Sequence, residues 1–445
     1  MTIMINGHSS ASERAGEDAM IDVEEEERLY RELFDVSNEA KEIGNEIHVD
    51  IVPAMNALRD AAPVMPGSLQ QLLELDGHTI NNWDVERDSY TLLSFAACDR
   101  ALRENLTFSS AGYLETPGVR SMGPVILAMT GDEHRRTRAV AQSMFLKPRA
   151  VNWWGPNWID EIVEQLMQRL DGRDTAELNI ELCARLPVNV VTRGIGMEGR
   201  MALVFRDHLL KATGVRKVTR EEQHASHIEV GRMLGDLIQL RRAEPGDDVI
   251  TGLIHNDFKL ADGGTRKLSD EEIIGFCRLV ILAGGGTTWR QLGITIYALL
   301  SNYHFWEACR DDRSLIEAAI EESARWMPTD PVFPRLMTED AVVDGVPVPA
   351  GVRIDMCLGS ANRDPSRWEN PDVYDLFREK KYHLGFGLGP HQCLGMNVAK
   401  QEMIVALNAL MDRFPNMRLD PAAPPPRIVG GLEQRGMSAI PVLLH

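Results

Sequence analysis

Several common features are missing from this sequence of 445 residues, and each absence excludes a class of protein. No run of about 18 apolar residues occurs, so no membrane anchor is predicted. The first 20 residues lack the apolar stretch of a signal peptide, which favours a cytoplasmic location. Only 47 Lys and Arg stand against 66 Asp and Glu, and the net charge of -19 argues against nucleic-acid binding.

Cysteine is also scarce, with six residues and no CxxC pair. This spacing fits neither a disulfide scaffold nor a zinc site. Five of the six stand in apolar or helical surroundings and are predicted to be inert packing residues. Cys393 differs from them, because a glycine-rich turn precedes it and a helical pattern begins just after it, near Gly395.

Helical patterns dominate the chain, so a mainly α fold with a minor antiparallel β region is predicted. Residues 1–20 are expected to form a flexible arm and 21–445 a single domain. Helices are predicted from about residue 20 onward and at 95–105, 131–144, 156–170, 221–243, 270–302, 314–327 and 395–413. Strands are predicted at 88–95, 342–356 and 438–444, and turns or connections at 245–254 and 418–431.

The segment from Ser269 to Leu300 combines a helical pattern with three consecutive glycines, Gly284 to Gly286. It is apolar nearly all round, which predicts a helix of about 45 Å that runs through the core. Each glycine in a helix interior costs about 1 kcal/mol relative to alanine. The run therefore indicates that something comes very close to this backbone. A helix break is one alternative and a phosphate cradle another, although the Lys of GxxxxGK[ST] is absent.

The segment HLGFGLGPHQCLGMNVAKQE, residues 383–402, places Cys393 at the start of a predicted helix. Backbone N–H groups and the helix dipole stabilise a thiolate at such a position. A thiolate there can be a nucleophile or a metal ligand. His391 beside Cys393 is compatible with zinc, but no second ligand pair stands at zinc spacing.

Phe386, Gly389, Cys393 and Gly395 form the pattern F-x-x-G-x-x-x-C-x-G, which resembles the haem-binding loop of the cytochrome P450 monooxygenases. Further motifs occur in the order of that family. They are GDEHRRTR at 131–138, AGGGTT in the long helix, Glu322-x-x-Arg325, and ANRDP at 361–365. The matches extend from about residue 85 to 442. The chain therefore resembles this family, whose fold has a long central helix over the haem.

The resemblance implies haem b, with Cys393 as the thiolate ligand of the iron, whose electron donation favours O–O cleavage. Haem carries two propionates that need cationic or hydrogen-bonding partners. His134, Arg138, Arg335 and His391 fall where the family places such partners. Surface salt bridging is the alternative for each of them.

The resemblance also implies a buried structural ion pair between Glu322 and Arg325, and loss of one partner would leave a buried charge unpaired. Val373 departs from the family, which often has Arg or His there to complete a triad with this pair. Arg378, slightly downstream, is the candidate substitute.

In the family, small residues of the long helix let its backbone approach the haem and leave a groove for O2, and Ala283 and Gly284 match them. Thr287 matches the threonine whose hydroxyl helps to deliver protons to dioxygen, although it can instead bond the carbonyl four residues back. Gly286 is a departure, because Asp or Glu usually precedes this threonine. Protons must then arrive through water, the substrate or another side chain.

The resemblance implies a pocket for a hydrophobic or aromatic small molecule. The corresponding residues are 119–127, Leu282, Ala283, Gly286, Thr287, Val332, Phe333, Leu432 and Glu433. Core packing is the alternative for Val332 and Phe333. Residues 195–215 correspond to the mobile lid of the family.

No flavin or iron–sulfur domain is evident in the sequence, so electrons are expected from a separate ferredoxin and its reductase. Arg135, Arg136, Lys380 and Lys381 are candidates for a basic docking patch, with scattered solvated charges as the alternative. The leading hypothesis is a monooxygenase that inserts one oxygen atom into a C–H bond or across a double bond. Peroxide-driven or atypical oxidation such as phenol coupling is the second hypothesis, and a haem sensor or carrier the third. No G-x-S-x-G elbow supports a hydrolase.

Overall fold

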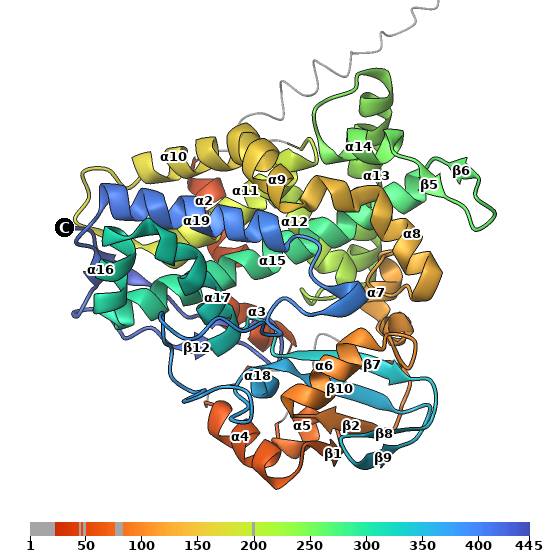
Figure 1. Cartoon of the computed structure of the whole chain (residues 1–445). Coiled ribbons are helices and arrows are strands. Elements are labelled where there is room, and N and C mark those ends of the chain that lie inside the picture. Colours follow the sequence, from red (N-terminus) through yellow and green to blue (C-terminus); the bar gives the residue numbers. More distant parts are fainter. Residues whose placement is uncertain (1–22, 44–45, 48–49, 76–82, 198–200) are drawn as a thin grey trace, which may run out of the picture.

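The computed structural model describes residues 23–43, 46–47, 50–75, 83–197 and 201–445. The predicted arm at 1–20 and the first two residues of the predicted domain lie outside this part of the chain. Helices form most of the molecule, and a smaller region of short strands lies at the bottom of Figure 1. This arrangement confirms the mainly α fold with a minor β region.

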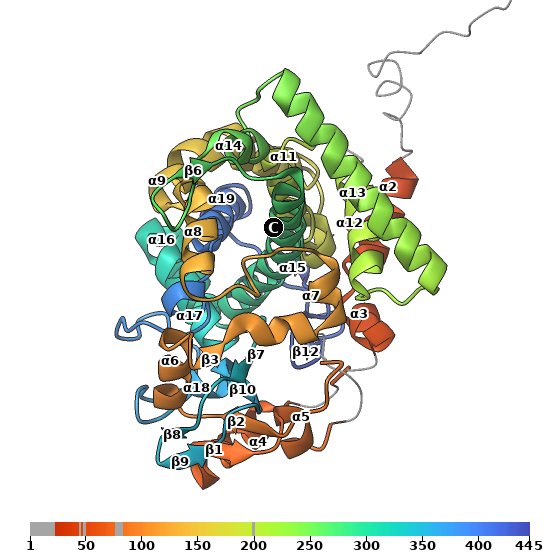
Figure 2. The same ribbon diagram turned by 90° about the vertical axis from the view of Figure 1, so that its right-hand side faces the viewer.

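Helix α15 (Asp270–Ser301) is the central element of the helical region, and Figure 2 shows it surrounded by other helices. Ser269 caps its first turn in a capping box with Glu272. The helix continues without interruption through Gly284 to Gly286, so the predicted long helix is confirmed and the helix-break alternative is wrong.

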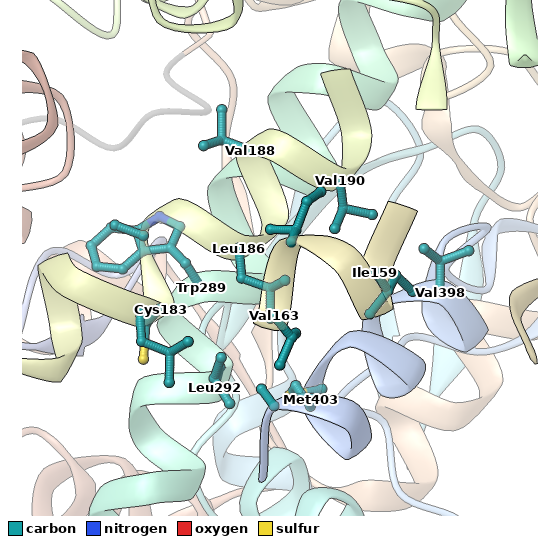
Figure 3. Packing of buried hydrophobic residues seen from close by; sticks show 14 of the residues in the cluster. Ile159, Val163, Cys183, Leu186, Val188, Val190, Trp289, Leu292, Val398 and Met403 are labelled. Carbon is teal, nitrogen blue, oxygen red and sulfur yellow. The ribbon is translucent and has the colours of Figure 1, made fainter. Parts of the chain in front are cut away.

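The core forms around α15 from three neighbouring segments, of which the first and the last pack directly on α15 and the second packs on those two. They are α11 (Arg185–Gly194), the π-helical segment η3 (Ala150–Ile159) with its continuation α10 (Asp160–Gln168), and α19 (Met396–Arg413). Figure 3 shows their interdigitating side chains, which include Ile159, Val163, Leu186, Val188, Val190, Trp289, Leu292, Val398 and Met403. Close packing of this kind holds α15 and α19 in fixed relative positions.

Two helices cover one side of α15, namely α12 (Met201–Thr213) and the longer α13 (Arg220–Ala243) (Figure 2). The remaining helices that matter for the site are α6 (Phe95–Arg103), α7 (Pro117–Ser121), α8 (Gly131–Gln142) and α17 (Ile316–Trp326). Others are α2 (Val23–Leu33), α3 (Val36–Ile43), α4 (Val52–Ala61), α5 (Leu69–Leu72), α9 (Lys147–Arg149), α14 (Val249–His255), α16 (Tyr303–Asp311) and α18 (Leu358–Ala361). No helix of the described residues is long and apolar enough to cross a membrane.

The main sheet has five strands in the order β1-β2-β10-β7-β3. Their bounds are β1 Val64–Pro66, β2 Ser89–Leu92, β3 Phe108–Ser109, β7 Val332–Met337 and β10 Arg353–Cys357. Strands β2 and β10 pair in parallel, with Ile354 opposite Tyr90, while the other pairs are antiparallel. The β region is therefore mainly antiparallel, as predicted, and the β2–β10 pair, which joins segments distant in sequence, is its parallel exception.

Smaller strand groups complete the β region. A three-stranded sheet has the order β11-β14-β4, and the two-stranded pairs are β5-β6, β8-β9 and β12-β13. Their bounds are β4 Thr175–Glu177, β5 Phe258–Lys259, β6 Thr265–Arg266, β8 Ala341–Val343, β9 Val346–Val348, β11 Arg418–Leu419, β12 Ile428–Val429, β13 Gly436–Met437 and β14 Pro441–Leu443. The predicted strands at 88–95, 342–356 and 438–444 are thus confirmed.

The predicted connection at 245–254 is wrong, because α14 occupies its second half. The Asp248 side chain accepts a hydrogen bond from the Thr251 backbone N–H at 2.8 Å and caps the helix. Val249, Ile250 and Leu253 are buried at helical spacing behind that cap. Pro245 and Gly246 end the preceding segment rather than span a long turn.

Candidate active site

The loop before α19 presents Cys393 at the helix start. The Cys393 backbone N–H donates to the Phe386 carbonyl at 2.9 Å, and the Gln392 N–H donates to the Gly389 carbonyl at 3.1 Å. These bonds close a compact turn from Phe386 to Cys393. Cys393 is exposed, whereas the other five cysteines are buried. The prediction that Cys393 alone differs from inert packing cysteines is confirmed.

Two glycines fit this loop closely against neighbouring helices. A Cβ at Gly385 would lie 2.4 Å from the Ala324 carbonyl oxygen in α17, and a Cβ at Gly389 would lie 2.4 Å from the Leu102 carbonyl oxygen in α6. Gly389 also has a left-handed φ of +68°. The loop is therefore held between α6 and α17 at positions where only glycine fits.

Replacement of Gly389 by Ala is expected to destabilise the fold strongly. Left-handed backbone strain alone costs about 1 to 3 kcal/mol for a residue with a Cβ, and the contact with the Leu102 carbonyl adds to it. Gly351→Ala is a matched control, because Gly351 has a φ of +82° and no neighbouring atom within 4 Å. Urea unfolding should show the larger loss for Gly389→Ala. Equal losses would contradict the close contact.

Neighbouring protein atoms desolvate the Cys393 thiol in part, although the residue is exposed. Burial raises the pKa of Cys393, while backbone N–H groups of Gly395 and Met396 and the charges of Arg138 and Lys400 lower it. Burial is the largest of these effects, and the helix start opposes it as predicted. Direct coordination of a metal ion removes the proton of such a thiol outright.

Two histidines meet beside this loop. The ring centroids of His134, in α8, and His391 lie 4.0 Å apart. Burial lowers the pKa of His134 to about 4, with Arg138 adding to the effect. Burial also lowers the pKa of His391 to about 2, helped by His134, Arg335 and Arg138. The Nε2 atoms of both rings are buried without a hydrogen-bond partner, so each is available to bond a polar atom of a ligand.

Two arginines extend this cluster. Arg138 lies within electrostatic reach of Cys393, and burial lowers the pKa of Arg138. Arg335 is buried, and its Nη1 donates to the Pro334 carbonyl at 2.8 Å. Neither arginine forms a salt bridge with a carboxylate of the described residues. The predicted propionate partners are thus brought together with unused donors, which fits a group that carries two carboxylates such as haem.

The glycine-containing stretch of α15 is open on one side. Ala283 is exposed, although it lies in the central helix, and a Cβ at Gly284 would meet Val191 at 3.4 Å. Thr287 Oγ1 donates to the Ala283 carbonyl at 2.9 Å, which confirms the predicted bond to the carbonyl four residues back. The exposed Ala283 fits a flat group lying against this helix.

Two arginines that sequence reasoning missed bind the carbonyls of the glycine run. Arg206, in α12, donates to the Gly285 carbonyl at 3.0 Å, and Arg290 donates to the Gly286 carbonyl. Arg290 also forms a buried ion pair with Glu39 in α3. The signal available in the sequence was a charged residue four positions after Gly286 in the mainly apolar part of the helix.

Glu322 and Arg325, in α17, form the predicted buried ion pair. Arg325 Nε and Nη2 donate to the two Glu322 carboxylate oxygens at 2.7 and 2.8 Å. Arg378 Nε donates to Glu322 Oε1 at 3.0 Å, while Val373 is exposed. The suggestion that Arg378 substitutes for the residue missing at 373 is therefore confirmed.

The ion pair connects to the Cys393 loop through the ANRDP segment. Arg325 Nη1 donates to the Asn362 carbonyl at 2.9 Å, and the Asn362 side chain accepts from the Leu384 N–H at 2.7 Å. Leu384 directly precedes Gly385, the first tightly packed glycine of the loop. Asn362 is thus a positioning residue that the motif match alone did not explain.

The predicted substrate-pocket residues divide between two clusters. Leu282 and Phe333 pack with Val119, Met122 and Val125, which belong to the predicted segment 119–127. Val332 packs instead with Leu432 in a separate core cluster. This agrees with core packing, the alternative given for Val332 above. Glu433 is buried and lies within electrostatic reach of Tyr113, a member of the first cluster.

The predicted lid at 195–215 is mostly the helix α12, while residues 198–200 lie outside the described residues.

The candidate docking residues are partly neutralised by neighbouring carboxylates. Arg135 is 76% exposed and pairs with Asp132 at 2.9 Å, and Lys381 pairs with Glu379. Lys380 is exposed.

Known proteins are similar to this chain in sequence and in fold. The family profile described as cytochrome P450 matches residues 237–433. Nocardicin C N-oxygenase of Nocardia uniformis subsp. tsuyamanensis is 33% identical over 395 residues, which cover 86% of this chain and 93% of that protein. Mycinamicin IV hydroxylase/epoxidase of Micromonospora griseorubida is 30% identical over 72% of this chain and 79% of its own length.

The cytochrome P450 PksS of Bacillus subtilis 168, from the bacillaene polyketide synthase, has a solved structure similar to this one. Its TM-score is 0.77, its sequence identity is 25%, and the match covers 89% of this chain and 97% of that one. The sequence relationship and the shared fold agree with the motif order and with the geometry around Cys393. The chain belongs to the cytochrome P450 family and is a P450 monooxygenase.

Proposed function

We propose that this enzyme binds haem b through Cys393 and inserts one atom of O2 into a hydrophobic small molecule, with electrons from a separate ferredoxin and its reductase. One observation carries the proposal. An accessible cysteine at the start of α19 stands beside four donor side chains, His134 and Arg335 buried and Arg138 and His391 half-buried, none of which forms a salt bridge with a carboxylate of the described residues. Haem iron held by a thiolate supplies the activation of O2, since thiolate donation favours O–O cleavage.

Other residues of this chain would bind the haem propionates and position the Cys393 loop. Arg138, Arg335, His134 and His391 would bind the propionates, because they are donors in a buried site without carboxylates. The backbone carbonyl of Phe386 fixes the turn that presents the Cys393 sulfur. Lys400 Nζ lies 5.1 Å from the centroid of the Phe386 ring and holds that ring in place.

Thr287 is proposed to hold and transfer protons through its hydroxyl on the open side of α15. Its Oγ1 donates to the Ala283 carbonyl, which leaves its lone pairs available to accept a hydrogen bond from water. Proton transfer by one positioned group typically contributes 10²- to 10⁴-fold to a rate.

Thr287→Ala is therefore expected to lower product formation about 10²-fold, with electrons diverted to reduced oxygen species. The measurement is product formed per electron pair consumed, with ferredoxin and reductase supplied. Thr295→Ala is the matched control, because Thr295 lies on the same helix and its Oγ1 also donates to the carbonyl four residues back, at 2.7 Å. Equal yields in the two variants would contradict the role of Thr287.

A second candidate function is oxidation driven by peroxide, and Gly286 is the observation that favours it. Position 286 carries no carboxylate, and Arg290 binds its carbonyl instead. A Cβ at Gly286 would meet only Arg290 Nη1, at 4.0 Å, so a side chain fits there.

Gly286→Asp is expected to raise product per electron pair with ferredoxin and to lower the rate with hydrogen peroxide, because the new carboxylate can deliver protons. Both rates should be measured on the same preparation. An enzyme that already uses electrons efficiently, with no gain in the variant, would show that another group delivers protons.

The substrate is proposed to be a hydrophobic small molecule. The cluster of Leu282, Phe333, Val119, Met122 and Val125 is apolar, and such surfaces bind apolar ligands. Two relatives are named for their action on nocardicin C and mycinamicin IV, which supports a small organic substrate. Ferredoxin docking is proposed at the exposed Arg135 and Lys380, where an acidic partner would compete with Asp132 for Arg135.

A further inference from the structure

Arg278 is a buried arginine in α15 that the proposed function does not use. Its relative exposure is 8%. Its guanidinium lies between two neighbouring segments, with Nη1 3.5 Å from the Met122 carbonyl oxygen and Nη2 3.3 Å from the His227 carbonyl oxygen of α13. A Cβ at Gly231 would lie 3.3 Å from Nη2, so the glycine leaves room for the guanidinium.

No carboxylate of the described residues forms a salt bridge with Arg278, and burial is the sole cause of its lowered pKa. Several other buried arginines have carboxylate partners, whereas Arg206, Arg335 and Arg435 resemble Arg278 in forming no salt bridge among the described residues. Arg185 pairs with Glu27, Arg290 with Glu39, Arg325 with Glu322, and Arg363 with Asp372. An isolated buried charge is strongly unfavourable unless a partner neutralises it.

The histidine side chains near Arg278 contribute no negative charge. Burial lowers the pKa of His227, and the charges of Arg278 and His224 lower it further. The lowered pKa disfavours a positive charge on His227 beside Arg278. The site around Arg278 thus offers one fixed cation and no protein anion from the described residues.

The two carbonyl contacts of Arg278 leave much of its bonding capacity unused. Distances of 3.3 and 3.5 Å lie beyond the usual range of about 2.7 to 3.2 Å for N–H···O bonds. A guanidinium carries five N–H donors in a planar fork that matches a carboxylate in bidentate fashion. Arg278 can therefore accept a carboxylate ligand without giving up strong existing bonds.

The position of Arg278 on α15 relates it to the proposed pocket. Residues four apart share a helix face, so Arg278 stands one turn before Leu282, a member of the apolar cluster. Met122, whose carbonyl contacts Arg278, belongs to the same cluster. Thr287 follows nine residues later, which places the two Cα atoms about 13 Å apart along the helix axis.

We infer that Arg278 binds the carboxylate of the substrate, which makes the substrate a hydrophobic carboxylic acid that is oxidised far from its acid group. The inference rests on the proposed function, because it assumes that the oxidised carbon lies near Thr287. The apolar body of the acid would occupy the cluster between Arg278 and Thr287. The long spacing excludes oxidation of the carbon next to the carboxylate.

The test compares three acids with their methyl esters, which differ in charge and hardly in shape. The probes are dodecanoate, 6-phenylhexanoate and lithocholate, titrated by calorimetry into the haem-loaded enzyme. At least one acid is expected to bind at least tenfold more tightly than its ester. If no acid of the three exceeds its ester, the inference is overturned.

Arg278→Gln separates charge from a structural role, because glutamine keeps N–H donors for the Met122 and His227 carbonyls. The variant is expected to bind the acid and its ester within twofold of each other, while its affinity for the ester stays at the wild-type value. A preference for the acid that survives in Arg278→Gln would overturn the inference.

Thermal unfolding without ligand gives a second readout. Arg278→Met removes the unpaired charge, so its melting temperature is expected to equal or exceed that of the wild type. A lower melting temperature in both variants, with unchanged acid preference, would mean that Arg278 only ties α13 to the 119–127 segment. Binding of acids without any oxidised product would instead contradict the proposed function, while the carboxylate-binding role of Arg278 would still be supported.

Discussion

Replacement of Cys393 by Ala is expected to abolish the absorption band of thiolate-bound haem and all product formation. The Cys393 sulfur is the proposed iron ligand at the start of α19, whereas the shape of the loop depends on backbone bonds. The Cys393 N–H to the Phe386 carbonyl and the glycine contacts at Gly385 and Gly389 all persist without the sulfur. The variant should therefore fold, and circular dichroism should match the wild type.

Cys309→Ala is the control for this prediction. Cys309, in α16, is buried, and burial raises its pKa to about 12, so it has no thiolate to offer. Its replacement is expected to leave the reduced carbon-monoxide spectrum unchanged. A Cys393→Ala protein that kept the thiolate band would place the iron ligand elsewhere.

Replacement of Glu322 by Gln is expected to lower the free energy of unfolding by about 3 to 5 kcal/mol, because it leaves the buried Arg325 without its charge partner. The Glu322 carboxylate also accepts bonds from Arg378 Nε and from the Asp375 N–H, both at 3.0 Å. Loss of these bonds loosens Asn362 and the Leu384 end of the Cys393 loop. Haem retention is therefore expected to fall together with stability.

The chain offers a matched control for Glu322→Gln. Glu229 and Arg232, in α13, have the same residue types at the same three-residue spacing, with Arg232 Nε 2.9 Å from Glu229 Oε2. This pair is exposed, so Glu229→Gln is expected to change stability by no more than about 1 kcal/mol. Denaturant unfolding measures both. A small loss in Glu322→Gln would mean that burial does not set the strength of the pair.

The parts of the site that the sequence predicted are those in which local chemistry determines position. Cys393 could be placed because a glycine-rich turn and a helix start are both local patterns. The helix through Gly284 to Gly286 could be predicted because apolar spacing resumes after the glycines. The ion pair of Glu322 and Arg325 is separated by less than one turn of α17, so one motif fixed both partners.

Contacts between distant segments could not be predicted in the same way. The parallel pairing of β2 with β10 joins residues more than 260 positions apart, and no local pattern encodes it. The hydrogen bond from Arg206 to the Gly285 carbonyl also joins distant segments and could not be predicted. Nor could the packing of Val332, which neighbours Phe333 on β7 but belongs to the cluster of Leu432 instead of that of Leu282. The helix α14 was missed because its Asp248 cap stands beside the stronger turn signal of Pro245 and Gly246.

The absorption spectrum of the purified wild-type enzyme, reduced with dithionite under carbon monoxide, tests the central claim most directly. Coordination of haem iron by Cys393 predicts the strongly red-shifted Soret band that is diagnostic of thiolate ligation. A band typical of histidine or neutral thiol ligation in well-folded protein, or folded protein that does not bind haem, would contradict that claim.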